Sequence, residues 1–348
     1  MKKLLLTGSY GTGETAASFR SFWFDERTGT LTPAQGIHLR NPSFAAVHGN
    51  VLYIVGEELE KGRLEAYRLD RSNGSMNFLS AVEFPGAATC HVLAWPGGSY
   101  VSCSNYLSGS FTVLPAMDGW LDQPIAVQQH TGQGYLCPGR QDGPHVHSTC
   151  ISPDGKRLFV ADLGLDWVEV FRIDAARGTL VKEGPQNQIH TPKGEGPRHM
   201  TFSSDGRRLY LVTELGNKCF VYDYNCATGA TSHIQTVSLL PSEFTAASKA
   251  ADVHLSPDDR FLYTSNRGAD TLAVFSVDSC TGQLTLIQQA FTHGNFPRSF
   301  CVCEHWVIIA NRHSGNIAVC QRNPQTGLVG EISHLESLEQ AAFVKLIN

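Results

Sequence analysis

Seven polar turns that end in glycine recur along this chain at intervals of 45 to 59 residues. In order they read DERTGTL, DRSNGSM, AMDGWL, DAARGTL, NCATGAT, DSCTGQL and NPQTGLV. Glycine suits the hairpin position that requires a positive φ angle. A period near 50 residues indicates a repeat architecture, in which each repeat buries its apolar face against the next. The seven glycines are Gly29, Gly74, Gly119, Gly178, Gly229, Gly282 and Gly327.

The content of each repeat predicts β-strands. The segments SPDGKRLFVADLG, SSDGRRLYLVTELG and SPDDRFLYTSNRG each combine a polar turn with a β-rich run, and WVEVFRID, KCFVYDY and TLAVFSVD follow them. Apolar and polar residues alternate in these runs, as they do in half-buried strands. About four short strands per repeat and almost no segments of helical period predict an all-β fold, a seven-bladed β-propeller. We expect one propeller domain spanning residues 1–348.

The phase of the repeat predicts how the ring closes. The first residues, KKLLLTGSYG, match the second strand of a repeat, and the last residues, AAFVKLIN, resemble a lone first strand. We therefore expect the C-terminal strand to complete the blade that begins at the N-terminus. Such a closure leaves no paired edge of the ring open.

Charge and composition exclude several classes of partner. The formal net charge is −5 and the pI is about 6.3, which disfavours electrostatic binding to nucleic acid or to an anionic membrane. No apolar run is long enough for a membrane span or a signal-peptide core. Ten cysteines occur without a C-x-x-C pair, which favours reduced core residues over a zinc site. We expect a cytoplasmic monomer.

One position of the repeat changes its chemistry from blade to blade. When the repeats are aligned on the S-x-D-G turn, His147, Arg198 and Ala251 occupy the same slot, and the Pro-Arg pair recurs at Arg298. The first strand of a propeller blade lines the central channel, so the start of this strand lies near one mouth. A purely structural slot tends to hold one residue type, so this variation indicates a functional site.

The end of the second strand behaves in the same way. Counted from the aromatic residue that opens the strand, Glu214 and Arg267 take equivalent positions, and Arg312 and Glu57 follow in other blades. These residues are expected at the same channel mouth. Arginine forks bind carboxylate or phosphate, whereas a histidine and a glutamate suit proton transfer. Polar groups that converge on one pocket predict a catalytic or binding site.

Several of these residues also have plainer explanations. An arginine after proline can pair with a carboxylate of the next blade, Glu214 can be an ordinary surface acid, and His145 or His199 can be a hydrogen-bonded scaffold group. The spacing of His145 and His147 permits metal chelation, but no cluster of carboxylate ligands accompanies them, so no metal is predicted. The chain also lacks the ending of a P-loop and the G-x-S-x-G elbow of serine hydrolases.

Long segments resemble the lactonase family of seven-bladed propellers. They include GPHVHSTCISPDGKRLFVADLG, GEGPRHMTFSSDGRRLYLVTELGN and SPDDRFLYTSNRGADTLAVFSVD, and the resemblance covers essentially the whole chain. Members of this family include a bacterial 6-phosphogluconolactonase and a fungal 3-carboxy-cis,cis-muconate lactonizing enzyme. The resemblance implies a cofactor-free site whose catalytic residues fall on His147, Arg198, Glu214 and Arg267. The chain departs from the family pattern at Asn311-Arg312-His313, where Arg312 adds a positive charge.

The sequence therefore predicts a sugar-lactone hydrolase that acts on a small-molecule lactone, foremost 6-phosphoglucono-δ-lactone. His147 or Glu214 is expected to activate water, while Arg198 or Arg267 stabilises the oxyanion. The expected substrate-binding residues are Arg298, Arg312, His199 and Glu57. The alternatives are hydrolysis of a non-phosphorylated aldonolactone, cycloisomerisation of a carboxylated muconate, and a non-catalytic propeller that binds a peptide or protein.

Overall fold

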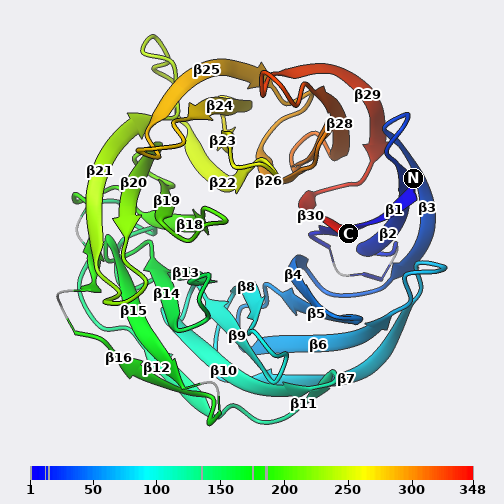
Figure 1. The fold of residues 1–348 in the computed structure, drawn as a ribbon. Helices are drawn as coiled ribbons and strands as arrows, with labels where there is room; N and C mark the ends of the chain where they lie inside the picture. The colour runs from blue at the N-terminus through cyan, green and yellow to red at the C-terminus, as the bar shows by residue number, and fades with distance from the viewer. Residues whose placement is uncertain are drawn as a thin grey trace.

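The computed structural model describes residues 2–11, 13–14, 16–134, 136–174, 176–184 and 187–347. Its β-strands form seven antiparallel sheets, which stand like blades around a central channel (Figure 1). The seven-bladed β-propeller predicted from the repeat is thus confirmed. None of the helical segments in the described part of the chain is long and apolar enough to cross a membrane.

The strands follow one another from the channel outward in six of the blades. Blade 2 contains β4 (Pro42–His48), β5 (Val51–Gly56), β6 (Gly62–Leu69) and β7 (Met76–Phe84). Blade 3 contains β8 (Thr89–Ala94), β9 (Tyr100–Asn105), β10 (Ser110–Met117), β11 (Trp120–Leu121) and β12 (Ala126–Gln129). Blade 4 contains β13 (Val146–Ile151), β14 (Arg157–Asp162), β15 (Trp167–Asp174), β16 (Thr179–Lys182) and β17 (Ile189–His190).

The remaining blades have four strands each. Blade 5 contains β18 (Pro197–Phe202), β19 (Arg208–Thr213), β20 (Lys218–Tyr224) and β21 (Thr231–Ser238). Blade 6 contains β22 (Lys249–Leu255), β23 (Phe261–Arg267), β24 (Thr271–Val277) and β25 (Leu284–Phe291). Blade 7 contains β26 (Pro297–Val302), β27 (Trp306–Asn311), β28 (Asn316–Arg322) and β29 (Val329–Ser337).

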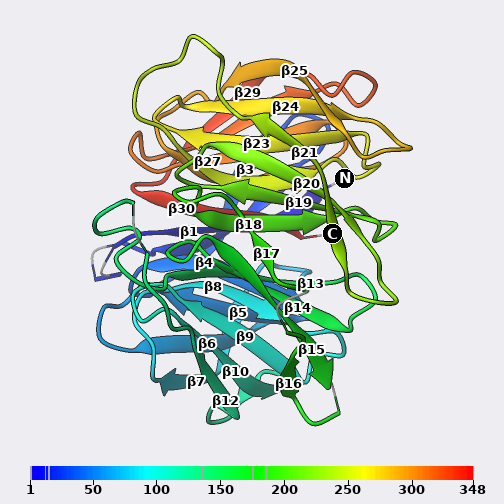
Figure 2. The same ribbon diagram turned by 90° about the vertical axis from the view of Figure 1, so that its left-hand side faces the viewer.

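Blade 1 joins the two ends of the chain, as the phase of the repeat predicted. It contains β1 (Lys2–Ser9), β2 (Phe19–Asp25), β3 (Thr30–Ile37) and β30 (Ala341–Ile347), in the order β3-β2-β1-β30. Residue Leu4 pairs with Ile347, and Gly8 pairs with Phe343. The innermost strand of this blade therefore comes from the C-terminus. It ends on the side of the ring where β1 begins, and Figure 2 shows the two chain ends on that side.

The seven turn glycines serve both the backbone and the packing between blades. All seven have φ between 65° and 86°. A Cβ on Gly29 would lie 2.4 Å from the Trp306 ring of blade 7, and one on Gly178 would lie 2.3 Å from Tyr100 of blade 3. Each turn thus packs against the preceding blade, where only glycine combines the left-handed conformation with the close approach.

The apolar core is divided into seven clusters, and each cluster fills the space between two neighbouring blades. The alternation of a β-strand explains this arrangement. In β1, Leu5 packs with Trp306 of blade 7, whereas Leu4 and Leu6 pack with Ile54 of blade 2. Because successive side chains point to opposite faces, one strand contributes to two clusters.

Candidate active site at one mouth of the channel

The first strand of every blade carries a β-bulge near its N-terminal end. In blade 5, Pro197 pairs with Thr213 and His199 pairs with Val212, so Arg198 between them is the extra residue. A bulge interrupts the alternation and re-aims its side chain, which is why bulges occur beside active sites. The extra residues of blades 1 to 5 and 7 are Ala342, Ser43, Cys90, His147, Arg198 and Arg298, and in blade 6 the pair Ala251 and Asp252 lies opposite Ser265 alone.

Three arginines surround the Glu214 carboxylate, which follows β19 directly. Its Oε2 atom accepts hydrogen bonds from Arg198 Nε at 2.9 Å and pairs with Arg267 Nη2 at 2.7 Å. Its Oε1 atom pairs with Arg140 Nη2. The side chains of Glu214 and Arg198 are each only 1% exposed. We call Glu214 with these three arginines the buried centre.

The electrostatics of the buried centre fix its protonation. Burial alone would raise the pKa of Glu214, but Arg267, Arg198 and Arg140 outweigh it and lower the pKa to about 2. Burial and the neighbouring Arg267 charge lower the pKa of Arg198 to about 10, against the opposing effect of Glu214. Both groups are therefore charged near neutral pH. This ionised Glu214 holds three guanidinium groups in fixed positions.

A second carboxylate centre lies at the ends of blades 1, 2 and 7. Glu57 Oε1 accepts hydrogen bonds from Tyr10 Oη at 2.7 Å and from Arg298 Nη2 at 2.5 Å. Arg312 stacks over the Tyr10 ring at 4.2 Å and donates from Nε to Gln340 at 2.9 Å. The Glu57 side chain is 20% exposed, so this group is more open than the buried centre. We call Tyr10, Glu57, Arg298 and Arg312 the open centre.

His147 projects from its bulge between aromatic neighbours. Its ring lies 5.7 Å from Tyr106 and 5.3 Å from His199, both edge to face. Its Nδ1 atom is buried and has no hydrogen-bond partner within the described part of the chain. Burial and the Arg198 charge hold the pKa of His147 well below its usual range. The imidazole is therefore neutral at physiological pH, and its Nδ1 atom is not hydrogen-bonded to a carboxylate of the described residues.

His199 follows Arg198 in the chain, and Asp252 holds its ring. Its Nδ1 atom lies 2.8 Å from Asp252 Oδ1. Burial and Arg198 lower the pKa of His199 to about 4, although Asp252 opposes this shift. A neutral His199 donates from Nδ1 to the carboxylate, which fixes the orientation of its ring. His199 in turn supports the edge of the His147 ring.

The irregular connection between blades 3 and 4 contributes Arg140, which lies outside the repeat, to the buried centre. His130 Nδ1 lies 2.7 Å from Asp162 Oδ2, and Gln141 Nε2 donates to Asp166 Oδ1 at 2.8 Å. These contacts hold the loop against blade 4, and Arg140 from this loop reaches Glu214. Connections of this length are often functional. The part of it at Tyr135 lies outside the described residues.

The structure brings together most of the residues predicted from the repeat. His147, Arg198, Glu214 and Arg267 lie at one mouth, and Arg298, Arg312 and Glu57 form the neighbouring group. Electrostatic coupling between Arg298 and both His147 and Arg198 links the two groups. His145 binds through both nitrogens, to the Tyr106 carbonyl at 3.0 Å and to Asp142 at 2.9 Å, as a scaffold residue does.

Sequence reasoning missed several members of the mouth. Cys90 fills the bulge slot of blade 3, but that blade lacks the S-x-D-G turn on which the repeats were aligned. Tyr10 follows the second strand of blade 1 in GSYG, the slot that Glu57 and Glu214 take elsewhere. Arg140 had no signal, since its loop is absent from the other repeats. Within the ranges described above, no group of three His, Cys, Asp or Glu side chains is arranged to hold a metal.

The fold and the site define a seven-bladed β-propeller with an arginine-rich candidate active site in its channel. A profile of the family described as lactonase, 7-bladed β-propeller, matches residues 4–346. This chain belongs to that lactonase family.

Similar proteins span the whole chain. The 6-phosphogluconolactonase of Bacillus subtilis (strain 168) is 31% identical over 347 residues, which covers 98% of this chain and 97% of the relative. The 6-phosphogluconolactonase of Formosa agariphila is 27% identical over 333 residues, with 93% of each chain covered. The solved structure of a periplasmic gluconolactonase from Pseudomonas aeruginosa has a TM-score of 0.91 and 31% identity, and covers 100% of this chain and 99% of that one.

Proposed function

We propose that this protein hydrolyses 6-phosphoglucono-δ-lactone to 6-phosphogluconate. The lactonase family and the two relatives named 6-phosphogluconolactonase support the reaction class. The substrate combines an ester carbonyl, which develops negative charge during attack, with a phosphate that is already anionic. A site for it needs one group of donors for each of these charges.

The charge of the mouth is the observation that carries this proposal. Five guanidinium groups, from Arg140, Arg198, Arg267, Arg298 and Arg312, lie there with only two carboxylates of the described residues, Glu214 and Glu57, and four of the five pair with them. Arg312 forms no ion pair with a described residue. The excess of positive charge suits a phosphorylated substrate, because guanidinium forks bind phosphate oxygens in pairs. We assign the phosphate to the open centre and the lactone carbonyl to the buried centre.

Within this proposal His147 is the general base. Glu214 is a poor base because its pKa is about 2 and its oxygens already accept from three arginines. His147 is neutral and has a nitrogen without a partner within the described part of the chain. A neutral imidazole accepts a proton in the transition state, which contributes about 10²–10⁴-fold to the rate. Glu214 thereby becomes a positioning residue that aims Arg198 and Arg267.

The proposed hydrolysis proceeds in three steps, in which His147 first takes a proton and then returns it. Water attacks the lactone carbonyl carbon while His147 takes one of its protons, and the carbonyl oxygen becomes an oxyanion beside Arg198 and Arg267. The oxyanion collapses, the bond from carbon to the ring oxygen breaks, and His147 returns the proton to that oxygen. The new carboxylic acid then ionises and releases its proton to solvent. No cofactor takes part in these steps.

The test is turnover of freshly prepared 6-phosphoglucono-δ-lactone above its spontaneous hydrolysis, with His147→Ala as the matched variant. We expect the wild type to exceed background strongly and the variant to lose about 10²–10⁴ in kcat while remaining folded. A wild type that does not exceed background on this substrate contradicts the proposal. Turnover restricted to unphosphorylated glucono-δ-lactone would instead assign a gluconolactonase activity, and closure of carboxymuconate would assign a cycloisomerase.

Oligomeric state and location stay predictions. We expect the protein to be a monomer, and analytical ultracentrifugation measures this directly. We also expect it to be cytoplasmic, whereas the relative from Pseudomonas aeruginosa is described as periplasmic. Fractionation of the source cells distinguishes these locations.

A further inference from the structure

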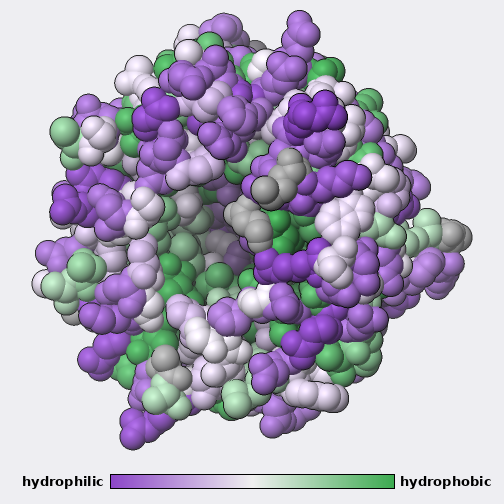
Figure 3. Space-filling view, turned by 45° about the vertical axis from the view of Figure 1, so that its right-hand side comes forward, coloured by the Kyte–Doolittle hydropathy of each residue, from purple (hydrophilic) through white to green (hydrophobic). Residues whose placement is uncertain are grey.

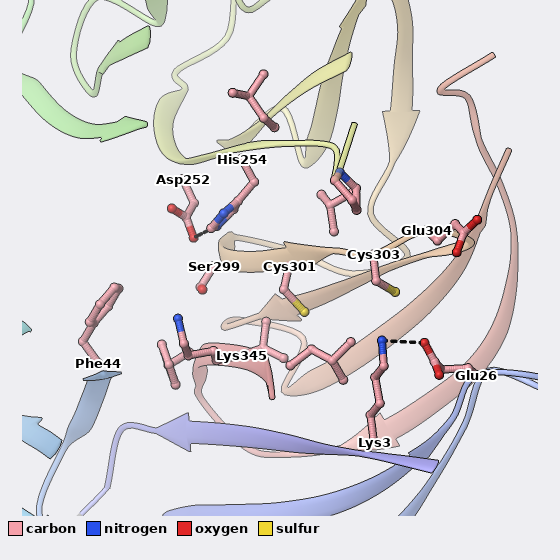
Figure 4. A pocket seen from close by; sticks show the side chains of 16 residues that line it. Lys3, Glu26, Phe44, Asp252, His254, Ser299, Cys301, Cys303, Glu304 and Lys345 are labelled. Atoms are coloured by element: carbon pink, nitrogen blue, oxygen red, sulfur yellow. Dashed lines mark ion pairs between the residues drawn. The ribbon is translucent and has the colours of Figure 1, made fainter. Parts of the chain in front are cut away.

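A second compartment of the channel lies beyond the ring of bulges. The side chains at the bulges are at most 8% exposed, so they fill the channel at that level. Beyond them a cavity of about 370 Å³ extends to the face where β1 begins, and that face is hollowed at its centre (Figure 3). We call this space the far cavity. Its lining includes Phe44, Asp252, His254, Ser299, Cys301 and Lys345 (Figure 4).

Two carboxylates of the far cavity, Asp252 and Glu26, already have partners. Asp252 receives His199 Nδ1 at 2.8 Å and the backbone N–H of Val253 at 3.0 Å, and its Oδ2 lies 3.2 Å from His254 Nε2. Burial alone would raise the pKa of Asp252, but His254 and His199 outweigh it and hold the pKa well below its usual range. At the outer end, Glu26 pairs with Lys3 at 2.8 Å.

Lys345 is a cationic group of the same cavity. It lies on β30 opposite Leu6, and its ammonium group projects into the cavity (Figure 4). No hydrogen bond or ion pair joins it to a residue of the described ranges. Nearby protein lowers the pKa of Lys345 by desolvation, although Cys301 and Asp252 oppose the shift, and the side chain stays exposed through the cavity. Asp252 in the same cavity favours the charged ammonium but forms no ion pair with it, so a small anion can make the direct contact that Asp252 does not make.

The neighbouring groups complete a small polar site. Ser299 on β26 faces the same part of the cavity as Lys345, and its hydroxyl can donate a hydrogen bond (Figure 4). The Phe44 ring forms an apolar wall across from them. A volume of about 370 Å³ falls within the ~300–1,000 Å³ that small-molecule sites occupy. An ammonium with a hydroxyl beside it recognises the oxygens of a small anion.

We propose that the far cavity binds a small oxyanion, a phosphate or a carboxylate, on Lys345 Nζ and Ser299 Oγ. This site is separate from the arginines of the mouth, because the bulge residues fill the channel between them. It does not depend on the proposed reaction. Its ligand can therefore reach the cavity from the face opposite the candidate active site.

Calorimetric titration of the wild-type protein with inorganic phosphate tests this proposal. We expect two classes of site, of which Lys345→Met removes one, with about tenfold or greater loss of affinity. Arg312→Ala is expected to weaken the other, and Lys61→Met serves as the control, because Lys61 lies on the outer surface in a pair with Glu83. Since Lys345 lines the far cavity and belongs to neither centre of the mouth, lactone turnover by Lys345→Met should match that of the wild type. Two classes of site that both persist in Lys345→Met would overturn the proposal.

A second measurement uses the unaltered protein and needs no variant to fold. Trace acetylation of lysines, followed by peptide mass spectrometry, gives the labelling rate of Lys345 with and without phosphate or acetate. We expect phosphate to slow labelling of Lys345 about tenfold or more while Lys61 is unaffected. Protection by both anions identifies a general oxyanion site, and protection by phosphate alone identifies a phosphate site. Equal labelling of Lys345 in all three conditions contradicts the proposal.

Discussion

The two carboxylates at the channel mouth, Glu214 and Glu57, differ in burial and in the number of arginines that hold them. Glu214 is 1% exposed and is held by three arginines, whereas Glu57 is 20% exposed and is held by Tyr10 and Arg298. In the buried centre all three arginines pair with the carboxylate, whereas the open centre includes Arg312, which pairs with no carboxylate in the described ranges. The comparison indicates a division of labour in which the buried centre is preorganised for the reacting carbonyl and the open centre for the phosphate.

Preorganisation explains why the costly arrangement is buried. An ion pair removed from water loses the free energy of hydration. Its Coulomb attraction offsets this loss only when its hydrogen bonds are well formed. At Glu214 every guanidinium nitrogen that contacts the carboxylate lies in a fixed direction, so the donors need not reorganise as charge develops on the oxyanion. The cost of such burial is offset by the seven apolar clusters between blades.

Removing the charge of Glu214 should produce the largest effect. In Glu214→Gln, three buried or half-buried arginines lose their counter-charge, which costs about 3–5 kcal/mol of stability. We expect a clearly lower melting temperature and a loss of kcat that exceeds that of Glu57→Gln. Because folding lowers the pKa of Glu214 from 4.5 to about 2, its contribution to stability is present above about pH 4.5 and is lost as the pH falls toward 2. Equal melting temperatures for Glu214→Gln and Glu57→Gln at neutral pH would contradict the comparison.

The His147→Ala variant should come next, with kcat reduced by about 10²–10⁴ and the fold retained. The pH dependence sharpens this prediction. The active form of the base is the neutral imidazole, and the pKa of His147 lies well below 6.5. On unphosphorylated glucono-δ-lactone, which carries no ionisable group, kcat/KM should stay flat above pH 6.5 and decline only in more acidic solution. A decline centred at or above pH 6.5 would contradict the assignment.

Arg312→Ala should separate the two centres by substrate. A charged hydrogen bond is worth about 1.5–3 kcal/mol, so KM for the phosphorylated lactone should rise by about 10–150-fold. The kcat/KM for glucono-δ-lactone should change by less than about threefold, since the buried centre is intact. Steady-state kinetics on both lactones measure this difference. Equal losses on both would show that Arg312 does not act on the phosphate.

Tyr10→Phe should give the smallest effect. The change removes one hydrogen bond to Glu57 and leaves the ring under Arg312, so about 0.5–1.5 kcal/mol is at stake. We expect KM for the phosphorylated lactone to rise by roughly two- to tenfold with kcat unchanged. A larger fall in kcat than in Glu57→Gln would place Tyr10 in the chemistry itself.

The repeat made part of this site predictable. His147 and Arg198 stand at one repeat position, so an alignment of blades placed them at the channel mouth before their contacts were known. The bulges themselves could not be foreseen, because the extra residues are Ala, Ser, Cys, His or Arg and none of them signals a bulge. Glycine turns were predictable because seven backbones need the same positive φ.

Other contacts depend on packing between distant segments. Arg140 reaches Glu214 only because His130 and Gln141 fasten its loop to blade 4. Asp252 meets His199 because neighbouring first strands lie side by side, which no single repeat encodes. The charged partners that surround Glu214 likewise come from two blades and a loop together. Repeat position therefore predicts where a side chain stands, while its partners are set by the assembled ring.

The most direct test is the ratio of kcat/KM for 6-phosphoglucono-δ-lactone to that for glucono-δ-lactone, measured in the wild type, His147→Ala and Arg312→Ala. The division of labour predicts that His147→Ala lowers both values by a similar factor and leaves the ratio unchanged. Arg312→Ala should lower the ratio by about tenfold or more. A ratio that changes in His147→Ala and stays constant in Arg312→Ala would contradict the account.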